Sequence, residues 1–424
     1  MGPGSKVKGR RSADRMDWDG TTKIVLTCGR GCAGALAKEA AGLGYNVESS
    51  EGAEDSAVEV EGNLRDAMRL NLWLRTANRV LFEVAAFETE DAEELYEGVA
   101  GLPWELWLRD DTPIHWRGAA RAEGLRDGRY ALLKCKDAVA DRFRAKRGHR
   151  PDASKSPAGA SCLSLQWFDG FARIFLDTSG ESLSNRGYRL DAWAAPVRET
   201  LAAAVLVEAG FDPEKEGLAA PMCGSGTFAI EGAWMAQRRA PGLGREEWPF
   251  LRYNEAPSRA WRELVEAARE VYRAAPGGWF GASDVDGGAV EATHRNAARA
   301  GVEKMIRLER CDFRASALPP GPGLVVMNPE WGERLGEAEE LEETYGAIGD
   351  WLKRAATGKR AAVLTGNAAL GRKIGLKPAK RAEVWNGPIE CRLLVYELYK
   401  GTRDWRLLAK REEKTVLRGE EKRH

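Results

Sequence analysis

Several features that would narrow the class of this protein are scarce in its sequence. The 424 residues include only four histidines, and lysine plus arginine balance aspartate plus glutamate to a formal net charge of zero. No apolar run approaches the roughly 20 residues that a membrane-spanning helix needs, so we expect no membrane association. Residues 1–20 are polar and basic without an apolar segment, so we expect no secretory signal.

Cysteine is also sparse, and its spacing is uninformative for disulfides. The seven cysteines are scattered at positions 28, 32, 135, 162, 223, 311 and 391. An odd, dispersed set is typical of reduced thiols, so we predict a cytoplasmic protein. Cys28 and Cys32 form one close pair, but no second pair and no histidine cluster completes a zinc site. The sequence therefore predicts no metal site.

Charge is balanced overall but unevenly distributed. Basic residues gather in ranges 6–15, 134–150 and 400–423, and the middle range has seven basic residues against two acids. A solvated helix face would explain any one of these ranges. Three separate ranges favour a surface that contacts phosphates of nucleic acid. The candidate RNA-binding residues are Lys134, Lys136, Arg142, Arg144, Lys146, Arg147 and Arg150.

The first 180 residues mix short strands and short helices, which is typical of an α+β fold. Alternating apolar and polar residues predict a strand over 56–61, a further strand is expected over 114–122, and Asp169-Gly170 predicts a hairpin between 161–168 and 171–177. An apolar stripe predicts an amphipathic helix over 129–146.

From residue 195 the pattern changes to apolar helices that alternate with short buried strands. The expected strands are 218–220, 279–283, 306–310, 324–327 and 360–364. This alternation predicts an α/β fold with a mostly parallel sheet and helices on both faces. Ligands of such sheets bind at the carboxyl ends of the strands, and the motifs described next all fall there.

A glycine turn follows the first of these strands. Gly224 and Gly226 allow a tight turn and close approach of the backbone to a ligand, and the next helix presents free N–H groups. Position 229 is alanine, so the dinucleotide pattern lacks its third glycine, and no phosphate-loop pattern occurs. The expected cofactor contacts are Pro221, Met222, Cys223, Gly224, Ser225, Gly226 and Thr227.

Carboxylates follow the next two strands. We expect Asp284, with Asp286 beside it, to accept hydrogen bonds from a ribose diol. The alternative is that Asp284 caps the helix that begins near Gly288. After the third strand, Asp312 could accept from an adenine amino group and Phe313 could lie against the ring.

The segment Asn328-Pro-Glu-Trp331 follows another buried strand. The Asn328 side-chain oxygen, which also borders the cofactor, and the Pro329 carbonyl could both accept from one amino group, which aims its nitrogen lone pair. Trp331 could then stack on a target base. The alternative is an ordinary turn with a packed tryptophan. The motifs together indicate an S-adenosylmethionine site beside a pocket for an exocyclic amine of a nucleobase.

At these motifs the chain resembles the THUMP-domain class I RNA methyltransferases that use S-adenosylmethionine, and within them most closely the bacterial 23S rRNA guanine-N2 methyltransferases. The resemblance spans about residues 22–400. It is carried by residues 71–79, 136–141, 185–189, 195–202, 221–227, 328–334 and 386–392.

The resemblance implies a ferredoxin-like segment, a THUMP domain for RNA docking, and a Rossmann-like methyltransferase domain. It implies methylation of guanine N2 in 23S rRNA or a precursor large subunit, and a role for Thr200 at the methionine end of the cofactor. The expected divisions are a disordered basic tail at 1–20, the ferredoxin-like segment at 21–65, the THUMP domain at 66–180, the methyltransferase domain at 185–400 and a charged tail at 401–424.

The chain departs from the family pattern at three positions. Ala220 stands where the family has an aspartate, and Glu330 and Trp331 replace a proline and a tyrosine. We expect the missing proline to loosen the turn. A carboxylate at Glu330 could accept from guanine N1–H and N2–H but would be repelled by adenine N1. The alternatives are a non-catalytic RNA-binding protein, which Ala220 favours, and an adenine-N6 methyltransferase.

Overall fold

The computed structural model describes residues 8–9, 17–50, 55–122, 125, 127–193, 196–274, 276–332 and 338–399. The expected charged tail at 401–424 lies outside this part, as does most of the tail at 1–20. Lys8–Gly9 pairs with residues 85–86, and Trp18 is buried and stacks on Tyr253. Disorder up to residue 20 is therefore wrong for these residues, because apolar contacts order the end of the segment.

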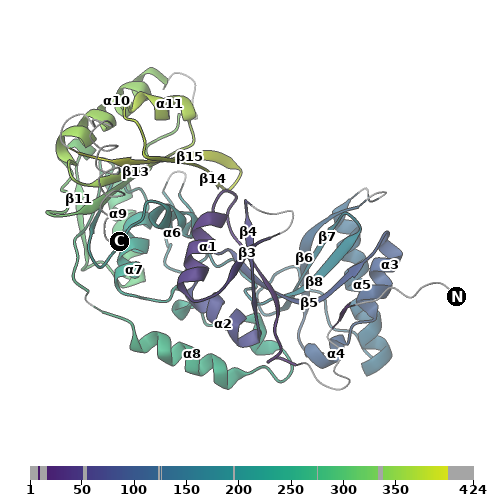
Figure 1. The fold of residues 1–424 in the computed structure, drawn as a ribbon. Helices are drawn as coiled ribbons and strands as arrows, with labels where there is room; N and C mark the ends of the chain where they lie inside the picture. The colour runs from purple at the N-terminus through teal and green to yellow at the C-terminus, as the bar shows by residue number, and fades with distance from the viewer. Residues whose placement is uncertain are drawn as a thin grey trace, which may run out of the picture.

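One eight-stranded sheet runs through the N-terminal half (Figure 1). Its order is β3 (Val47–Ser49), β4 (Ala57–Gly62), β2 (Thr22–Thr27), β5 (Arg79–Glu88), β8 (Phe171–Asp177), β7 (Ser161–Phe168) and β6 (Ile114–Arg121), and β1 (Lys8–Gly9) also pairs with β5. The pair β6–β7 is parallel and the other pairs are antiparallel. The hairpin expected over Asp169-Gly170 is present, and both turn residues have positive φ.

In the part of the chain that the structure describes, this sheet is accompanied by the helices α1 (Ala33–Gly42), α2 (Leu64–Trp73), α3 (Ala92–Ala100), α4 (Trp104–Trp107) and α5 (Gly128–Arg147). Helix α2 begins with a reciprocal capping box between Asn63 and Asp66. The boundary that we expected at residue 65 therefore cuts into α2 and must lie later in the chain.

The C-terminal half is a doubly wound domain, which confirms the α/β expectation. Its sheet has the order β11 (Ile306–Arg310), β10 (Phe280–Asp284), β9 (Gly217–Pro221), β12 (Gly323–Met327), β13 (Arg360–Thr365), β15 (Ile389–Glu397) and β14 (Lys380–Asn386). The first five strands are parallel, and the last two add an antiparallel pair. The helices are α6 (Glu199–Glu208), α7 (Thr227–Ala236), α8 (Ser258–Glu270), α9 (Gly287–Ala300), α10 (Ala338–Ala355) and α11 (Ala368–Lys373), with 3-10 turns η1 (Pro241–Gly244), η2 (Pro249–Arg252) and η3 (Phe313–Ala315).

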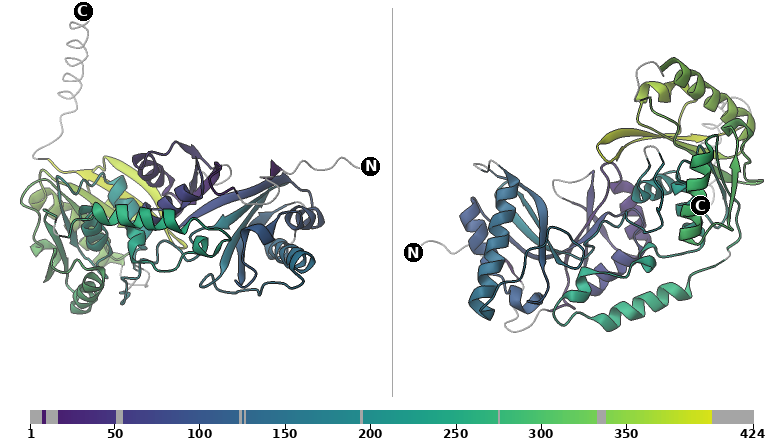
Figure 2. Two further views of the ribbon diagram at one scale, coloured as in Figure 1. Left: turned by 90° about the horizontal axis from the view of Figure 1, so that it is seen from below. Right: turned by 180° about the vertical axis from the view of Figure 1, so that it is seen from behind.

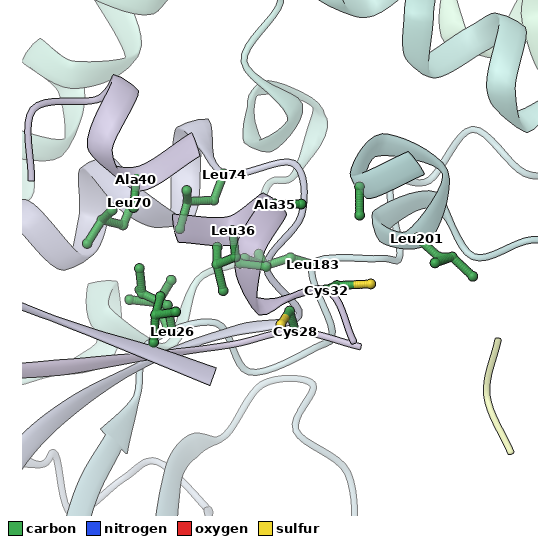
Figure 3. Close-up of a cluster of buried hydrophobic side chains, with 14 of the residues drawn as sticks. Leu26, Cys28, Cys32, Ala35, Leu36, Ala40, Leu70, Leu74, Leu183 and Leu201 are labelled. Carbon is green, nitrogen blue, oxygen red and sulfur yellow. The ribbon is translucent and has the colours of Figure 1, made fainter. Parts of the chain in front are cut away.

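The two halves share a packed junction. Leu36 of α1 lies in one buried cluster with Leu183 and Leu201 of the following half (Figure 3). The loop before α1 also contacts β14, because Trp385 N donates to the Arg30 carbonyl at 3.1 Å. The ferredoxin-like part is thus attached to the doubly wound domain by apolar packing and by hydrogen bonds.

The whole molecule is elongated. Figures 1 and 2 show α3 and α5 at one end, α10 and α11 at the other, and α1 and α2 between them. No helix of the described residues is long and apolar enough to cross a membrane.

Candidate active site

A cavity of about 550 Å³ opens at the carboxyl ends of β9, β10 and β12. Its volume lies within the range of small-molecule sites. Four loops that follow strands line it, together with the segment that precedes α6. The lining residues include Met222, Cys223, Gly224, Ser225, Thr227, Asp284, Asp286, Asp312, Phe313, Asn328, Pro329 and Glu330. Sequence motifs that lie a hundred residues apart thus meet in one cavity.

The glycine turn is fixed from behind by β10 and α9. Gly224 N donates to Asp284 Oδ2 at 3.0 Å, and Thr293 Oγ1 donates to the Gly224 carbonyl at 2.8 Å. Gly224 has φ +53°, and a Cβ there would project into open space. A Cβ at Gly226 (φ +80°) would meet Thr293 at 2.6 Å. Gly224 therefore leaves room for a ligand, whereas Gly226 leaves room for α9.

Two further residues of the turn have unusual surroundings. Met222 is a non-glycine residue with φ 60°, a sparsely populated backbone conformation that occurs often at functional sites. Burial raises the pKa of the Cys223 thiol to about 12, so the thiol stays protonated and is a poor nucleophile at neutral pH. Cys223 therefore serves as a wall of the cavity.

The two acids after β10 have different roles. Asp284 accepts from Gly224 N and, through Oδ1, from Asp286 N at 3.0 Å. Asp286 caps α9 by accepting from Gly288 N at 2.7 Å. The helix cap is therefore Asp286 rather than Asp284. Because Asp286 is exposed and only its Oδ1 is engaged among the described residues, its second oxygen is available to a ligand.

Asp312 and Phe313 follow β11 and border the cavity. Asp312 accepts from Arg314 N at 2.8 Å and pairs with the Arg314 guanidinium at 3.0 Å. The Phe313 ring packs edge-on against Trp351, with Arg314 over its face at 4.7 Å. An adenine ring could therefore stack on this face of Phe313 only if the Arg314 side chain moves aside or stacks together with it.

Asn328 lines the cavity with a side-chain oxygen that lacks a partner among the described residues. Its Oδ1 is buried and accepts no hydrogen bond within the described structure. An unpaired buried acceptor is costly, so it indicates a ligand donor that completes it. Pro329 is buried beside it, and Glu330 is exposed at the cavity edge.

Trp331 does not lie where we expected. It is buried to 9% exposure, does not line the cavity, and packs so closely on Gly366 that a Cβ there would meet its ring at 2.4 Å. The packed-tryptophan alternative therefore describes Trp331, and the role as a stacking surface for a base is corrected. Its Nε1 is buried without an acceptor among the described residues.

The turn is also less loose than the missing proline predicts. Tyr345 donates to the Glu330 carbonyl at 3.0 Å, and Asn367 Nδ2 donates to the Trp331 carbonyl at 3.3 Å. Burial raises the pKa of Tyr345 to about 12, which keeps this hydroxyl a donor. Two hydrogen bonds thus hold the turn in place of a ring.

Three residues near the expected cofactor site face elsewhere. Thr200 is buried and donates to Asn78 Oδ1 at 2.9 Å, across the junction of the two halves, so its expected place at the methionine end is corrected. Ala220 and Pro221 border a separate hollow of about 10 Å³, behind β9 and β10. The alanine that replaces the family's aspartate therefore does not line the cavity.

The basic residues of α5, together with Arg150 just beyond its end, divide into two groups. Arg142 forms a bidentate pair with Glu105 at 2.6 and 2.8 Å, Lys134 contacts Glu93, and Arg144 pairs with Asp141. Arg147 is exposed but donates to the Glu105 carbonyl at 3.2 Å. Lys136, Lys146 and Arg150 are exposed without an ion pair to a described residue. Arg142 is thus the residue most fully engaged by an acid of the protein. Lys136, Lys146 and Arg150 are the most available to contact phosphates.

Sequence reasoning missed two contributors to the cavity. Trp193 lines it, is 38% exposed, and is held by a hydrogen bond from its backbone N to Ser225 Oγ at 2.8 Å. The linker 185–189 was noted only for its family resemblance, yet Arg189 donates to Thr227 Oγ1 at 3.0 Å. The signals that could have identified them are an arginine and an aromatic residue shortly before α6, the first helix of the doubly wound domain. No group of three potential metal ligands occurs in the described ranges.

A doubly wound sheet, a glycine turn, acids after the next strand and an Asn-Pro turn define the methyltransferase class of fold. Family models match the chain three times: an RlmL ferredoxin-like domain at residues 23–81, a THUMP domain at 89–156 and an RMKL-like methyltransferase domain at 186–394. The chain therefore combines an RlmL ferredoxin-like domain, a THUMP domain and an RMKL-like methyltransferase domain.

Individual relatives agree with this assignment. The chain is 37% identical over 388 residues to the ribosomal RNA large subunit methyltransferase K/L of Stutzerimonas stutzeri, covering 89% of this chain and 53% of that protein. It thus spans about half the length of this curated relative.

Two solved structures are similar over most of their length. SMU.472, a putative methyltransferase complexed with SAH, matches at TM-score 0.79 and 25% identity, covering 90% of this chain and 99% of that one. A predicted N6-adenine-specific DNA methylase from Listeria monocytogenes matches at TM-score 0.79 and 28% identity, covering 89% and 97%.

Proposed function

We propose that this protein transfers a methyl group from S-adenosylmethionine to the N2 amine of a guanine in RNA, with 23S rRNA or a precursor of the large subunit as the substrate in the cytoplasm. The similarity to ribosomal RNA large subunit methyltransferases supports the substrate class. The SAH complex of SMU.472 supports the cofactor.

The residues of the cavity fit this cofactor. Gly224 leaves open space at the turn, Asp286 keeps one free carboxylate oxygen, and Thr227 begins α7 at the cavity wall. These groups suit a ribose diol and an anionic end of a ligand. Bound S-adenosylmethionine would supply an electrophilic methyl group.

The buried, unpaired oxygen of Asn328 is the observation that carries the proposal. An exocyclic amine offers two hydrogens, and Asn328 Oδ1 with the Pro329 carbonyl provides two acceptors. Holding both hydrogens fixes the direction of the nitrogen lone pair, so catalysis is mainly positioning. The amine loses a proton readily after methylation, so no histidine base is needed.

Glu330 supports guanine as the base. Its side chain is exposed at the cavity edge, where a carboxylate can accept from adjacent N1–H and N2–H donors. Adenine presents an acceptor at N1 and would be repelled. The Listeria relative, named as a predicted N6-adenine-specific DNA methylase, makes adenine the main alternative.

The shape of the molecule supports a large substrate. Figure 1 shows α5 at one end of the molecule and α10, whose residues Glu340, Leu341 and Thr344 line the cavity, toward the other. A single nucleoside could not contact both, whereas a structured RNA could.

The test is methylation of rRNA from cells that lack the corresponding gene, followed by digestion and mass spectrometry of the nucleosides. We expect new N2-methylguanosine with the wild-type protein and at least a 100-fold lower rate with Asn328→Ala, by analogy with loss of a preorganised group. Asn46→Ala, an exposed asparagine outside the cavity, is the matched control.

N6-methyladenosine instead would replace guanine by adenine in the proposal. No methylated nucleoside on free rRNA or precursor subunits would favour the non-catalytic RNA-binding alternative.

A further inference from the structure

The linker 185–189 contacts α6 and α7 with three of its side chains. Arg186 Nε lies 3.5 Å from Glu231 Oε1, and Tyr188 donates to the same oxygen at 3.1 Å. Glu231 is fully buried, and burial raises its pKa above the usual range, although Arg186 opposes this shift. These two contacts account for the attachment of the linker but do not reach the cavity.

Arg189 contacts the cavity wall. Its Nε donates to Glu199 at 2.8 Å, and its Nη2 donates to the Val197 carbonyl at 2.8 Å and to Thr227 Oγ1 at 3.0 Å. Val197 and Thr227 both line the cavity. The guanidinium therefore braces two wall residues that come from different segments.

Two donors remain unused at this place. A guanidinium has five N–H hydrogens, and Arg189 Nη1 is buried without an acceptor among the described residues. Because Thr227 Oγ1 accepts from Arg189, its own hydrogen is free to point away, and the described residues offer it no acceptor. Arg189 does not itself line the cavity, so of these two donors only the Thr227 hydroxyl borders it, where it can donate to an anionic acceptor.

The backbone adds to the same preference. Thr227 is the first residue of the ten-residue helix α7, whose first N–H groups are unpaired within the helix and carry a partial positive charge. A neutral or cationic group would be a poor match there. An S-adenosyl ligand carries one carboxylate, at its methionine end.

From this geometry we infer that Arg189, acting with Thr227, positions the carboxylate of the methionine end of the cofactor. Arg189 is a positioning residue, since it acts largely through Thr227. This inference rests on the proposed function. Arg189 and Thr227 would thus provide a contact for the methionine end that neither Ala220, which replaces the family's acid, nor Thr200, which faces away, provides.

The test compares two ligands by isothermal titration calorimetry. S-adenosylhomocysteine has the amino-acid end, whereas 5′-methylthioadenosine has the same nucleoside and sulfur without it. We expect Arg189→Ala to weaken S-adenosylhomocysteine about 10- to 100-fold, because it removes both the brace on Thr227 and the positive charge behind it, and to change 5′-methylthioadenosine less than twofold.

Matched variants separate binding from folding. Thr227→Val removes only the hydroxyl, keeps the side-chain shape, and should weaken S-adenosylhomocysteine selectively, about 3- to 10-fold. It decides the question if Arg189→Ala does not fold. Arg198→Ala removes an exposed arginine that does not line the cavity and should change neither affinity.

An equal loss for both ligands, or no loss for either, would overturn this inference while leaving the proposed function intact. Failure of the wild-type protein to bind either ligand would overturn the proposed function and this inference with it.

Discussion

At the scale of single residues, the site is defined by atoms that the protein leaves unpaired. Most polar groups around the cavity satisfy one another, as Asp284 does with Gly224 and Asp286 does with Gly288. Asn328 Oδ1, which borders the cavity, and Arg189 Nη1, which lies behind its wall, have no hydrogen-bond partner among the described residues. A buried group without a partner costs free energy in folding, so the unpaired Asn328 oxygen favours a ligand that completes it.

Base preference is a residue-scale prediction. Glu330→Gln replaces one acceptor oxygen by a donor, so we expect the ratio of guanine to adenine methylation to fall about tenfold, within the usual range of a lost base contact. Mass spectrometry of nucleosides from matched guanine and adenine RNAs measures the ratio. Glu343→Gln, an exposed acid of α10, should leave it unchanged. An unaltered ratio in Glu330→Gln would mean that the base is selected elsewhere.

At the scale of elements, sequence patterns predicted structure wherever the pattern was local. The hairpin of β7 and β8 and strand β11 have the predicted bounds, because alternation and an Asp-Gly turn need no distant partner. The short strand β3 and the short helix α11 were missed, because each has too few residues to show a repeating pattern of apolar and polar positions. The division at residue 65 failed because the capping box of α2 lies across it.

Site residues divide in the same way. The strand-end rule brought Asp284, Asp312 and Asn328 to one cavity, since it depends only on sheet direction. The roles of Thr200 and Trp331 could not be read from the sequence, because their partners Asn78 and Gly366 are remote in the chain.

Helix α5, with Arg150 just beyond its end, gives the element-scale prediction. Replacing Lys136, Lys146 and Arg150 together by alanine should weaken RNA binding. The slope of log K against the logarithm of salt concentration should become shallower by about 2 to 3, because each free cation that binds a phosphate releases about one counterion. Filter binding across a salt series measures this slope.

Arg142→Ala is the contrasting variant on the same helix. Its guanidinium is occupied by Glu105, so the change should lower the free energy of unfolding by about 1–3 kcal/mol and leave the salt slope nearly unchanged. Equal salt slopes for the triple variant and the wild type would exclude this face of α5 from RNA binding.

At the scale of the whole molecule, the ferredoxin-like part is held between the other two parts. Gly31, with φ +80°, lies so close to β14 that a Cβ would meet the Glu383 carbonyl at 1.9 Å. The cluster around Leu36 and Leu201 adds apolar burial to this contact. The attachment therefore depends on close approach of two backbones.

Gly31→Ala tests this attachment. The positive φ alone costs an alanine about 1–2 kcal/mol, and displacement from β14 should add about 1–3 kcal/mol. Gly44→Ala is the matched control, since Gly44 has φ +91° and open space around it. Thermal unfolding of both variants should show the larger loss for Gly31→Ala. Equal losses would show that the backbone contact contributes nothing.

Strand β5 belongs to two domains at once. Residues 79–82 pair with β2 of the ferredoxin-like part, and residues 81–88 pair with β8 beside the THUMP region. A flexible linker would let the two parts move relative to each other. A shared strand instead holds them rigidly, so the distance between α5 and the cavity is fixed. For an RNA that touches both, the protein fixes the span between anchor and target. The target nucleotide would then be selected by its distance from the RNA segment bound at α5 as well as by the identity of its base.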